Sequence, residues 1–180
     1  MDDFLLQLFL YELKRQCTYA AVCYNEMVHY SKLSDWDLNK GRLWYSLELF
    51  LIAAAKISII FRPKLQYKKR GEELSNILSV DSTAAFHTRR PRNYLEHFDE
   101  QLDDWYATST RHNLADSVIF PSNKIIGADY LRGFFTDNFA FVFLKEEYEI
   151  TPIYESILEL SKKVDNEQIN VQQRLMSAPP

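Results

Sequence analysis

The chain has 180 residues, of which 47% are hydrophobic and 14% are aromatic. This length and composition predict one globular domain with a sizeable core and exclude a disordered chain. A formal net charge of −4 excludes a protein that coats nucleic acid with a broadly basic surface, although a small local phosphate site remains compatible with it. The presence of only 4 glycines and 6 prolines favours long helices.

Two long helices are predicted at residues 3–31 and 37–62, where apolar residues recur at helical spacing. The second helix ends where Pro63 follows it, because proline cannot continue the hydrogen-bond ladder. The polar residues that mark the solvent side of the first helix are Lys14, Arg15, Gln16 and Glu26. Two such helices joined by a short loop favour an antiparallel pair.

The apolar run at 43–61 is nearly long enough to cross a membrane. Glu48 and Lys56 lie inside this run, and each is costly at the depth of a bilayer. We therefore predict a buried core helix at this position and no membrane association.

A cytoplasmic location is predicted from both the start of the chain and its cysteines. Asp2 and Asp3 stand where a secretory signal has basic residues. Cys17 and Cys23 fall in opposite phase on one predicted helix, and they are the only cysteines. Both are interpreted as reduced core residues.

A basic segment at 64–71 and a short helix at 72–78 lead to a third long helix, predicted at 83–106. Three arginines lie near the start of this third helix and carboxylates fill its later turns. This order opposes the helix dipole, which favours anions at the N-terminus, and so invites a functional explanation. The apolar stripe predicted for its core side is Tyr94, Leu95, Phe98, Leu102 and Trp105.

Within the third helix lies the motif Arg92-Asn93-x-x-x-His97. Asn93 and His97 are four residues apart and share a face, whereas Arg92 lies about 140° round the axis from His97. The pattern resembles the RN-x-x-x-H signature of HEPN domains, a helical family found in prokaryotic toxins and nucleic-acid-processing systems. The acidic residues that follow, as in Phe98-Asp99-Glu100, are similar to those of HEPN-like bacterial proteins.

The resemblance implies a metal-independent endoribonuclease, in which the ribose 2′-OH attacks the adjacent phosphate. Histidine exchanges a proton near neutral pH, so His97 is the candidate acid–base group. Arginine presents a charged planar fork to phosphate oxygens, which suits Arg92. Asn93 is the third candidate catalytic residue, and it orients His97 or binds the phosphate. Arg89 and Arg90 are candidate phosphate- or RNA-binding residues.

The resemblance also implies a homodimer, since the family usually brings two motifs together, and an antitoxin or nucleotidyltransferase as a further partner. No cofactor and no metal are predicted. Carboxylates on the third helix favour a solvated acidic face, because the Glu-x-x-His spacing of a di-metal bundle site is missing. These carboxylates are Glu96, Glu100, Asp103 and Asp104.

Two other interpretations remain open. Arg92 and Glu96 have the spacing of an ordinary helix salt bridge, with His97 satisfying a buried polar contact. In addition, a HEPN-like fold can serve as a non-catalytic module that binds a partner protein, a nucleotide or RNA, because fold alone does not fix function.

After a loop at 107–116, the sequence becomes rich in β-formers. Short strands are predicted at 117–120 and 123–126. A β-hairpin is predicted at 130–144 around Thr136-Asp137-Asn138. The side chains expected on one face of the hairpin are Phe139, Phe141 and Phe143.

A last helix is predicted at 152–164, and the polar segment 165–180 is expected to be a flexible tail. The predicted fold is therefore mainly α. It is an antiparallel helical bundle, HEPN-like, with a small β-hairpin appendage near the C-terminus. A single domain at 1–164 contains this β-hairpin region, about 117–146.

Overall fold

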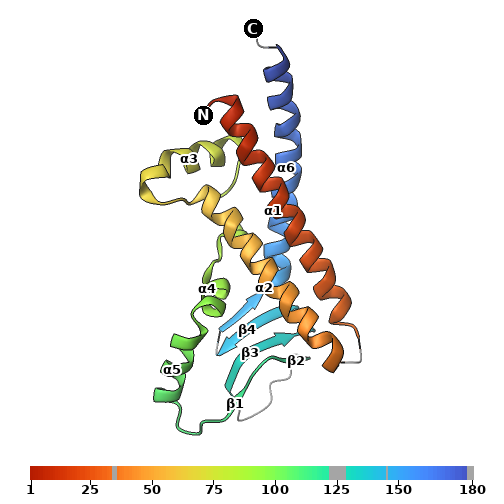
Figure 1. The fold of residues 1–180 in the computed structure, drawn as a ribbon, viewed down its shortest axis with the longest axis vertical. Helices are drawn as coiled ribbons and strands as arrows, with labels where there is room; N and C mark the ends of the chain where they lie inside the picture. Colours follow the sequence, from red (N-terminus) through yellow and green to blue (C-terminus); the bar gives the residue numbers. More distant parts are fainter. Residues whose placement is uncertain (34–35, 122–128, 145, 178–180) are drawn as a thin grey trace.

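The computed structural model describes residues 1–33, 36–121, 129–144 and 146–177. The described chain is mainly helical, with a small five-stranded sheet that lies at the end of the molecule away from both termini (Figure 1). In chain order the elements are α1 (Asp3–Tyr30), α2 (Trp36–Phe61), the 3-10 turn η1 (Leu65–Tyr67), α3 (Lys68–Ile77), the 3-10 turn η2 (Ala85–His87), α4 (Arg90–Glu96), α5 (Phe98–Thr108), β1 (Leu114–Ala115), β2 (Val118–Phe120), β3 (Asp129–Phe135), β4 (Ala140–Leu144), β5 (Glu146–Glu149) and α6 (Ile150–Ser177).

The first helix, α1, packs against both α2 and α6 and runs in the opposite direction to them (Figure 1). The side chain of Asp2 caps α1 by accepting a hydrogen bond of 2.8 Å from the Leu5 N–H. The bounds predicted for the first two helices agree with α1 and α2 to within one residue. Gln16 is a correction, because it is buried instead of solvent-facing and donates to the Glu12 carboxylate at 2.7 Å.

The helix α2 has one stretch, Asn39–Phe61, that is long and apolar enough to cross a membrane, but 67% of its most apolar window is buried inside the protein. This burial is consistent with the predicted core helix. Cys17 and Cys23 are free and buried, as predicted. Burial raises the pKa of the Cys17 thiol to about 12, so this thiol stays protonated and unreactive.

The single helix predicted at 83–106 is wrong. The chain instead forms η2, α4 and α5, and it breaks at His97, where φ is −113° and ψ is 36°. The break explains the unusual order of charges in this segment. It places Asp99 and Glu100 in the first turn of α5, where the helix dipole favours anions. Phe98, predicted for the core, is 44% exposed, and the Arg132 guanidinium lies 5.9 Å from its ring centre.

Two contacts hold the broken segment against the sheet. The ring of Tyr94 in α4 stacks on Phe143 of β4, with centroids 4.8 Å apart. In α5, the Trp105 indole N–H donates to the Asp129 carboxylate at 2.9 Å. Each half of the segment therefore has its own anchor on the sheet.

The predicted hairpin is present as β3 and β4, which pair antiparallel with Phe134 opposite Phe141. It belongs to a larger sheet, in which β5 pairs with β4 and both β1 and β2 pair in parallel with β3. The strand predicted at 117–120 corresponds to β2, whereas the one predicted at 123–126 lies outside the described residues. Phe141 and Phe143 face the main core, as the alternation predicted.

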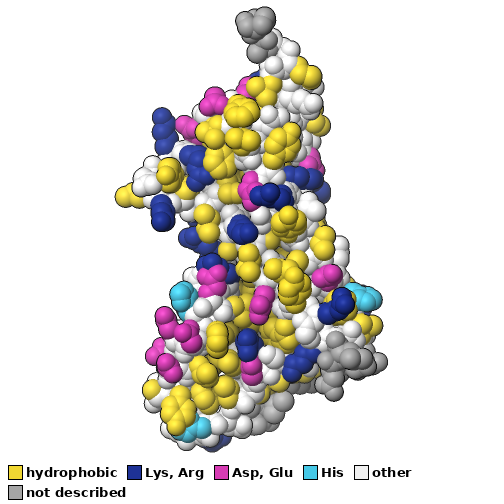
Figure 2. Space-filling model, viewed as in Figure 1, with side chains coloured by type: hydrophobic (Ala, Val, Ile, Leu, Met, Phe, Trp, Pro, Cys, Tyr) yellow, Lys and Arg dark blue, Asp and Glu magenta, His cyan; other side chains and the backbone are white. Residues whose placement is uncertain are grey.

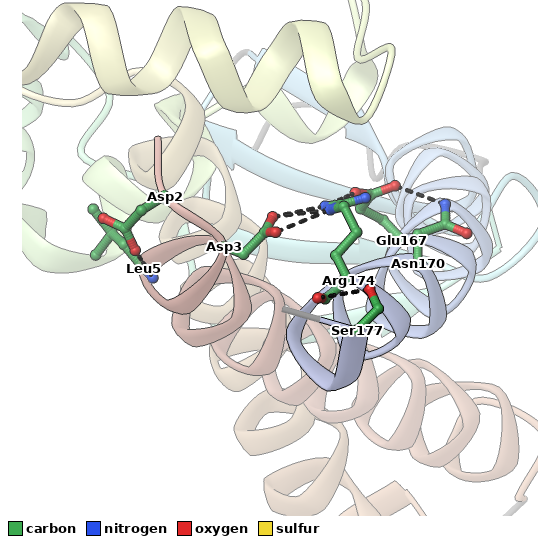
Figure 3. Close-up of polar contacts among 7 residues, drawn as sticks. All are labelled: Asp2, Asp3, Leu5, Glu167, Asn170, Arg174 and Ser177. Carbon is green, nitrogen blue, oxygen red and sulfur yellow. Dashed lines mark hydrogen bonds and ion pairs between the residues drawn. The ribbon is translucent and has the colours of Figure 1, made fainter. Parts of the chain in front are cut away.

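The flexible tail predicted after residue 164 is also wrong, because α6 continues to Ser177. Val171 is fully buried seven residues after Val164, which continues the apolar stripe at helical spacing. Figure 3 shows the polar contacts that hold this end of α6 to α1. The Arg174 guanidinium donates to both Asp3, at 2.9 Å, and Glu167, at 3.0 Å.

Val171→Ala is expected to lower the free energy of unfolding by about 1–2 kcal/mol, because two buried methyl groups are lost and a small cavity remains. Ile169→Ala is the matched control, since Ile169 is 57% exposed and should change stability little. Urea denaturation of both variants measures the difference. Equal stabilities for the two variants would mean that the end of α6 does not pack against α1.

Candidate functional site

The motif residues lie on α4 and at its junction with α5. Pro91 is buried in the first turn of α4 and fixes the start of the helix against the core. The side chain of Arg92 is partly exposed, and that of Asn93 is exposed. His97 stands at the break between the helices, with 59% of its side chain exposed. All three candidate catalytic residues are therefore accessible from solvent.

Within the chain, Arg92 and His97 have separate carboxylate partners. Arg92 forms an ion pair with Glu96 and donates to the side-chain oxygen of Asn93 at 3.4 Å. His97 Nδ1 lies 3.7 Å from the Glu100 carboxylate. The helix salt bridge considered from the sequence is thus present, but the buried polar contact considered for His97 is not, because His97 is exposed.

The candidate RNA-binding arginines differ in their surroundings. Arg90 forms an ion pair with Glu146 at 2.9 Å. Glu146 also accepts hydrogen bonds from the hydroxyls of Tyr148 and Tyr94. Three groups lower the pKa of the Glu146 carboxyl: the hydrogen bond from Tyr148, the hydrogen bond from Tyr94 and the charge of Arg90. The carboxylate is therefore charged at neutral pH and compensates the charge of Arg90. Arg89 is exposed and is the better placed of the two to meet a phosphate.

A second polar group was missed in the sequence. His87, at the end of η2, lies with Nδ1 at 3.1 Å from the hydroxyl of Ser58, which is fully buried in α2. Burial, together with the charges of Arg62 and Arg89, lowers the pKa of the His87 imidazole to about 4. The imidazole is therefore neutral at pH 7. Nothing in the sequence signals this pair, because 29 residues separate its members.

His87 and Arg62 line a cleft of about 400 Å³ beside α3. Figure 2 shows Lys and Arg side chains gathered around α3, whereas Asp and Glu gather on the α4–α5 side. The charge segregation expected from the sequence thus exists in space. The basic surface continues from α3 towards the start of α4, where the charges of Arg62 and Arg89 both act on His87.

A larger cleft, of about 560 Å³, lies between α5 and the sheet. Its aromatic and polar lining comes from segments far apart in sequence, which is why no local pattern predicted it. The lining residues that carry rings or carboxylates are Tyr94, Asp104, Trp105, Asp129, Phe143 and Glu146. The combination of flat rings with hydrogen-bonding groups suits a polar organic ligand or a side chain of a partner protein.

Comparisons of this chain with protein-family models, with curated proteins and with solved structures each found no match. Across the described ranges, no group of three or more His, Cys, Asp or Glu residues is arranged to hold a metal ion. The choice of site therefore depends on the geometry of α4, α5 and their surroundings.

The burial of His87 near Arg62 and Arg89 should make stability depend on pH. The pKa of His87 is about 4 in the folded chain and near 6.5 when unfolded, so its contribution is complete above pH 6.5 and falls as the pH drops towards 4. After discounting for solvent screening, we expect a loss of about 1–2 kcal/mol over this window. Urea denaturation of the wild type and of His87→Gln, which does not titrate, isolates the effect. The same pH slope in both proteins would contradict it.

Proposed function

We propose that this chain is a HEPN-like, metal-independent endoribonuclease that acts as a homodimer, with α1, α2 and α6 as its antiparallel helical bundle. The observation that carries the proposal is that Arg92, Asn93 and His97 are all accessible from solvent, on α4 and at its C-terminal boundary, in the segment that Arg89 begins. A histidine and an arginine that both reach solvent offer a proton-transfer group and a phosphate ligand.

The ion pair between Arg92 and Glu96 does not oppose this function. Ion pairs of this kind between exposed side chains at i and i+4 contribute only about 0.3–0.5 kcal/mol. A phosphate accepts two parallel hydrogen bonds from the guanidinium fork, and this bidentate contact is stronger. Bound RNA can therefore replace Glu96 as the partner of Arg92 at little cost.

The proposed reaction needs two proton transfers. His97 takes the proton of the ribose 2′-OH while the 2′-oxygen bonds to phosphorus and the bond from phosphorus to the 5′-oxygen breaks. Arg92 stabilises the negative charge that builds on the phosphate oxygens. The 5′-oxygen then receives its proton from a second, protonated histidine. A homodimer supplies that histidine as the His97 of the second protomer, and it lets each Arg92 face the other chain.

Incubation of the purified protein with RNA in the presence of a chelator tests the proposal. Cleavage should proceed without metal, and the upstream products should end in a 2′,3′-cyclic phosphate, because the 2′-oxygen is the nucleophile. DNA of the same sequence is the control and should stay intact, since it has no 2′-OH. If no RNA is cleaved, or if the products carry other ends, the assignment fails.

A second candidate is the non-catalytic binding module, and the cleft between α5 and the sheet favours it. Tyr94 and Trp105 supply flat walls there, and both are fixed by contacts with the sheet. Retention of RNA, a nucleotide or a partner protein without any cleavage would support this function. An adjacent gene for an antitoxin or a nucleotidyltransferase would instead favour the nuclease.

A further inference from the structure

A strongly basic stretch runs from the end of α2 through η1 into α3. Residues 62–70 contain five cations and no carboxylate, in a chain whose formal net charge is −4. A local concentration of positive charge of this kind attracts an anionic partner. The five cations are Arg62, Lys64, Lys68, Lys69 and Arg70.

Carboxylates of the chain leave most of this charge uncompensated. The two carboxylates of α3 are already engaged, Glu72 with Lys68 at 3.4 Å and Glu73 with the Met1 ammonium at 3.0 Å. Figure 2 shows the Lys and Arg side chains that gather around α3 as a result. The cations of residues 62–70 that form no ion pair with a described carboxylate are Arg62, Lys64, Lys69 and Arg70.

An aromatic ring lies exposed among these cations. Tyr67, in η1, is 54% exposed. The Arg70 guanidinium lies 5.9 Å from the centre of this ring and 4.5 Å from that of Phe9, so it holds the turn against α1. Proteins that bind single-stranded nucleic acid combine cations, which follow the phosphates, with exposed rings, on which bases stack. Residues 62–70 have both features.

The positive charge continues from α3 towards the motif. Arg62 directly follows α2 and Arg89 precedes α4, and the charges of both act on His87. Arg92 comes three residues after Arg89. A line of charge of this kind suits a strand of nucleic acid. A flat membrane would meet only the projecting part around α3, where η1 offers one strongly exposed aliphatic side chain, Leu65 (Figure 1).

We propose that η1 and the start of α3 hold the RNA strand outside the cleavage site. Lys64, Lys68 and Lys69 contact its phosphates, and one base stacks on Tyr67. The choice of RNA as the ligand rests on the proposed function, whereas the affinity for a single strand does not. These side chains set how tightly a long substrate binds, and they take no part in the chemistry at the motif.

Fluorescence anisotropy with a labelled single-stranded DNA oligonucleotide tests this surface. DNA shares the phosphates and bases of RNA but has no 2′-OH, so its binding is measured without cleavage. Replacing Lys64, Lys68 and Lys69 by Ala together should flatten the slope of log affinity against log salt by about 2, since each phosphate contact contributes about 0.7. Lys32→Ala is the control, because exposed Lys32 follows the far end of α1, about 30 Å from Phe9. An unchanged slope in the triple variant would overturn the proposal.

The stacked base has its own matched pair of variants. Tyr67→Ala should weaken binding of the oligonucleotide by about 10-fold, and Tyr67→Phe should keep the affinity of the wild type, because it keeps the ring. Equal affinities of the two variants would contradict stacking. Binding to phosphatidylglycerol vesicles without binding to the oligonucleotide would assign the surface to a membrane and overturn RNA as the ligand.

Cleavage assays separate this surface from the motif. With a long RNA, the triple lysine variant should raise KM and leave kcat unchanged, whereas cleavage of a dinucleotide should match the wild type, because a dinucleotide reaches the motif alone. An equal loss on both substrates would mean that the lysines act at the cleavage site, against the proposal. Binding of the oligonucleotide without cleavage of any RNA would refute only the nuclease.

Discussion

His97→Ala is expected to reduce the rate of RNA cleavage by about 10²–10⁴-fold, the usual contribution of a positioned acid–base group. The loss should appear in kcat, because His97 is proposed to transfer a proton in the transition state and not to bind the substrate. His97 is exposed at a helix break, so the variant should keep the thermal stability of the wild type. His29→Ala is the control, since His29 is an exposed histidine on α1 far along the chain from the motif.

The rate of RNA cleavage should depend on Arg92 as strongly as on His97, but through phosphate binding and not through proton transfer. Arg92→Ala is expected to be comparably damaging, and Arg92→Lys should recover little activity, because an ammonium cannot reproduce the two parallel hydrogen bonds of the guanidinium. If Arg92 serves only its ion pair with Glu96, both variants will cleave as the wild type does, since that pair contributes little. If His97→Ala cleaves RNA as fast as the wild type does, the nuclease proposal is wrong and the binding-module proposal takes its place.

Gly71→Ala is expected to destabilise the fold by about 2–3 kcal/mol, towards the upper end for overpacking of a core. Gly71 is buried in α3, where it packs against the end of α2. A Cβ at this position would lie 2.3 Å from the Phe61 carbonyl oxygen and 2.7 Å from Pro63 Cδ. The first of these is a backbone atom, so it cannot move aside as a flexible side chain would.

The same substitution at Gly41 should change the stability of the fold in the opposite direction. Gly41 lies in α2 with nothing within 4 Å of the position of a Cβ. Gly41→Ala should therefore stabilise the protein by about 0.5–1 kcal/mol, the difference between the two residues inside a helix. Thermal or urea denaturation of the two variants compares the signs directly. Stabilisation by both would mean that α3 does not pack closely on α2.

Local periodicity predicted the parts of the fold that depend on neighbours in sequence. The apolar repeats fixed α1 and α2 to within one residue, and alternation around Thr136-Asp137-Asn138 located the hairpin. The end of α6 was missed because apolar residues are sparse after Val164, and the burial of Val171 depends on α1. The pairing of β1 and β2 with β3 likewise depends on contacts between distant segments.

Some features of the candidate site could likewise be predicted from the local sequence, and others depend on contacts between distant segments. The motif could be found in the sequence because Arg92, Asn93 and His97 are close together in it, but their exposure to solvent was not predicted. The break at His97 could be suspected only from the order of charges, and it depends on the anchors that Tyr94 and Trp105 find on the sheet. The pair of Ser58 and His87 has no local signal at all, since tertiary packing alone creates it.

The contact between α1 and α6 has a consequence for biosynthesis. Asp3 and Arg174 are 171 residues apart, and Lys14 meets Asp165 across a similar span. During translation, the side of α1 that packs on α6 stays open to solvent while most of the chain is being made. Pairing across such a span is slow, because a long loop must close first. A ribosome-bound chaperone that covers apolar helices should therefore engage α1 until α6 emerges.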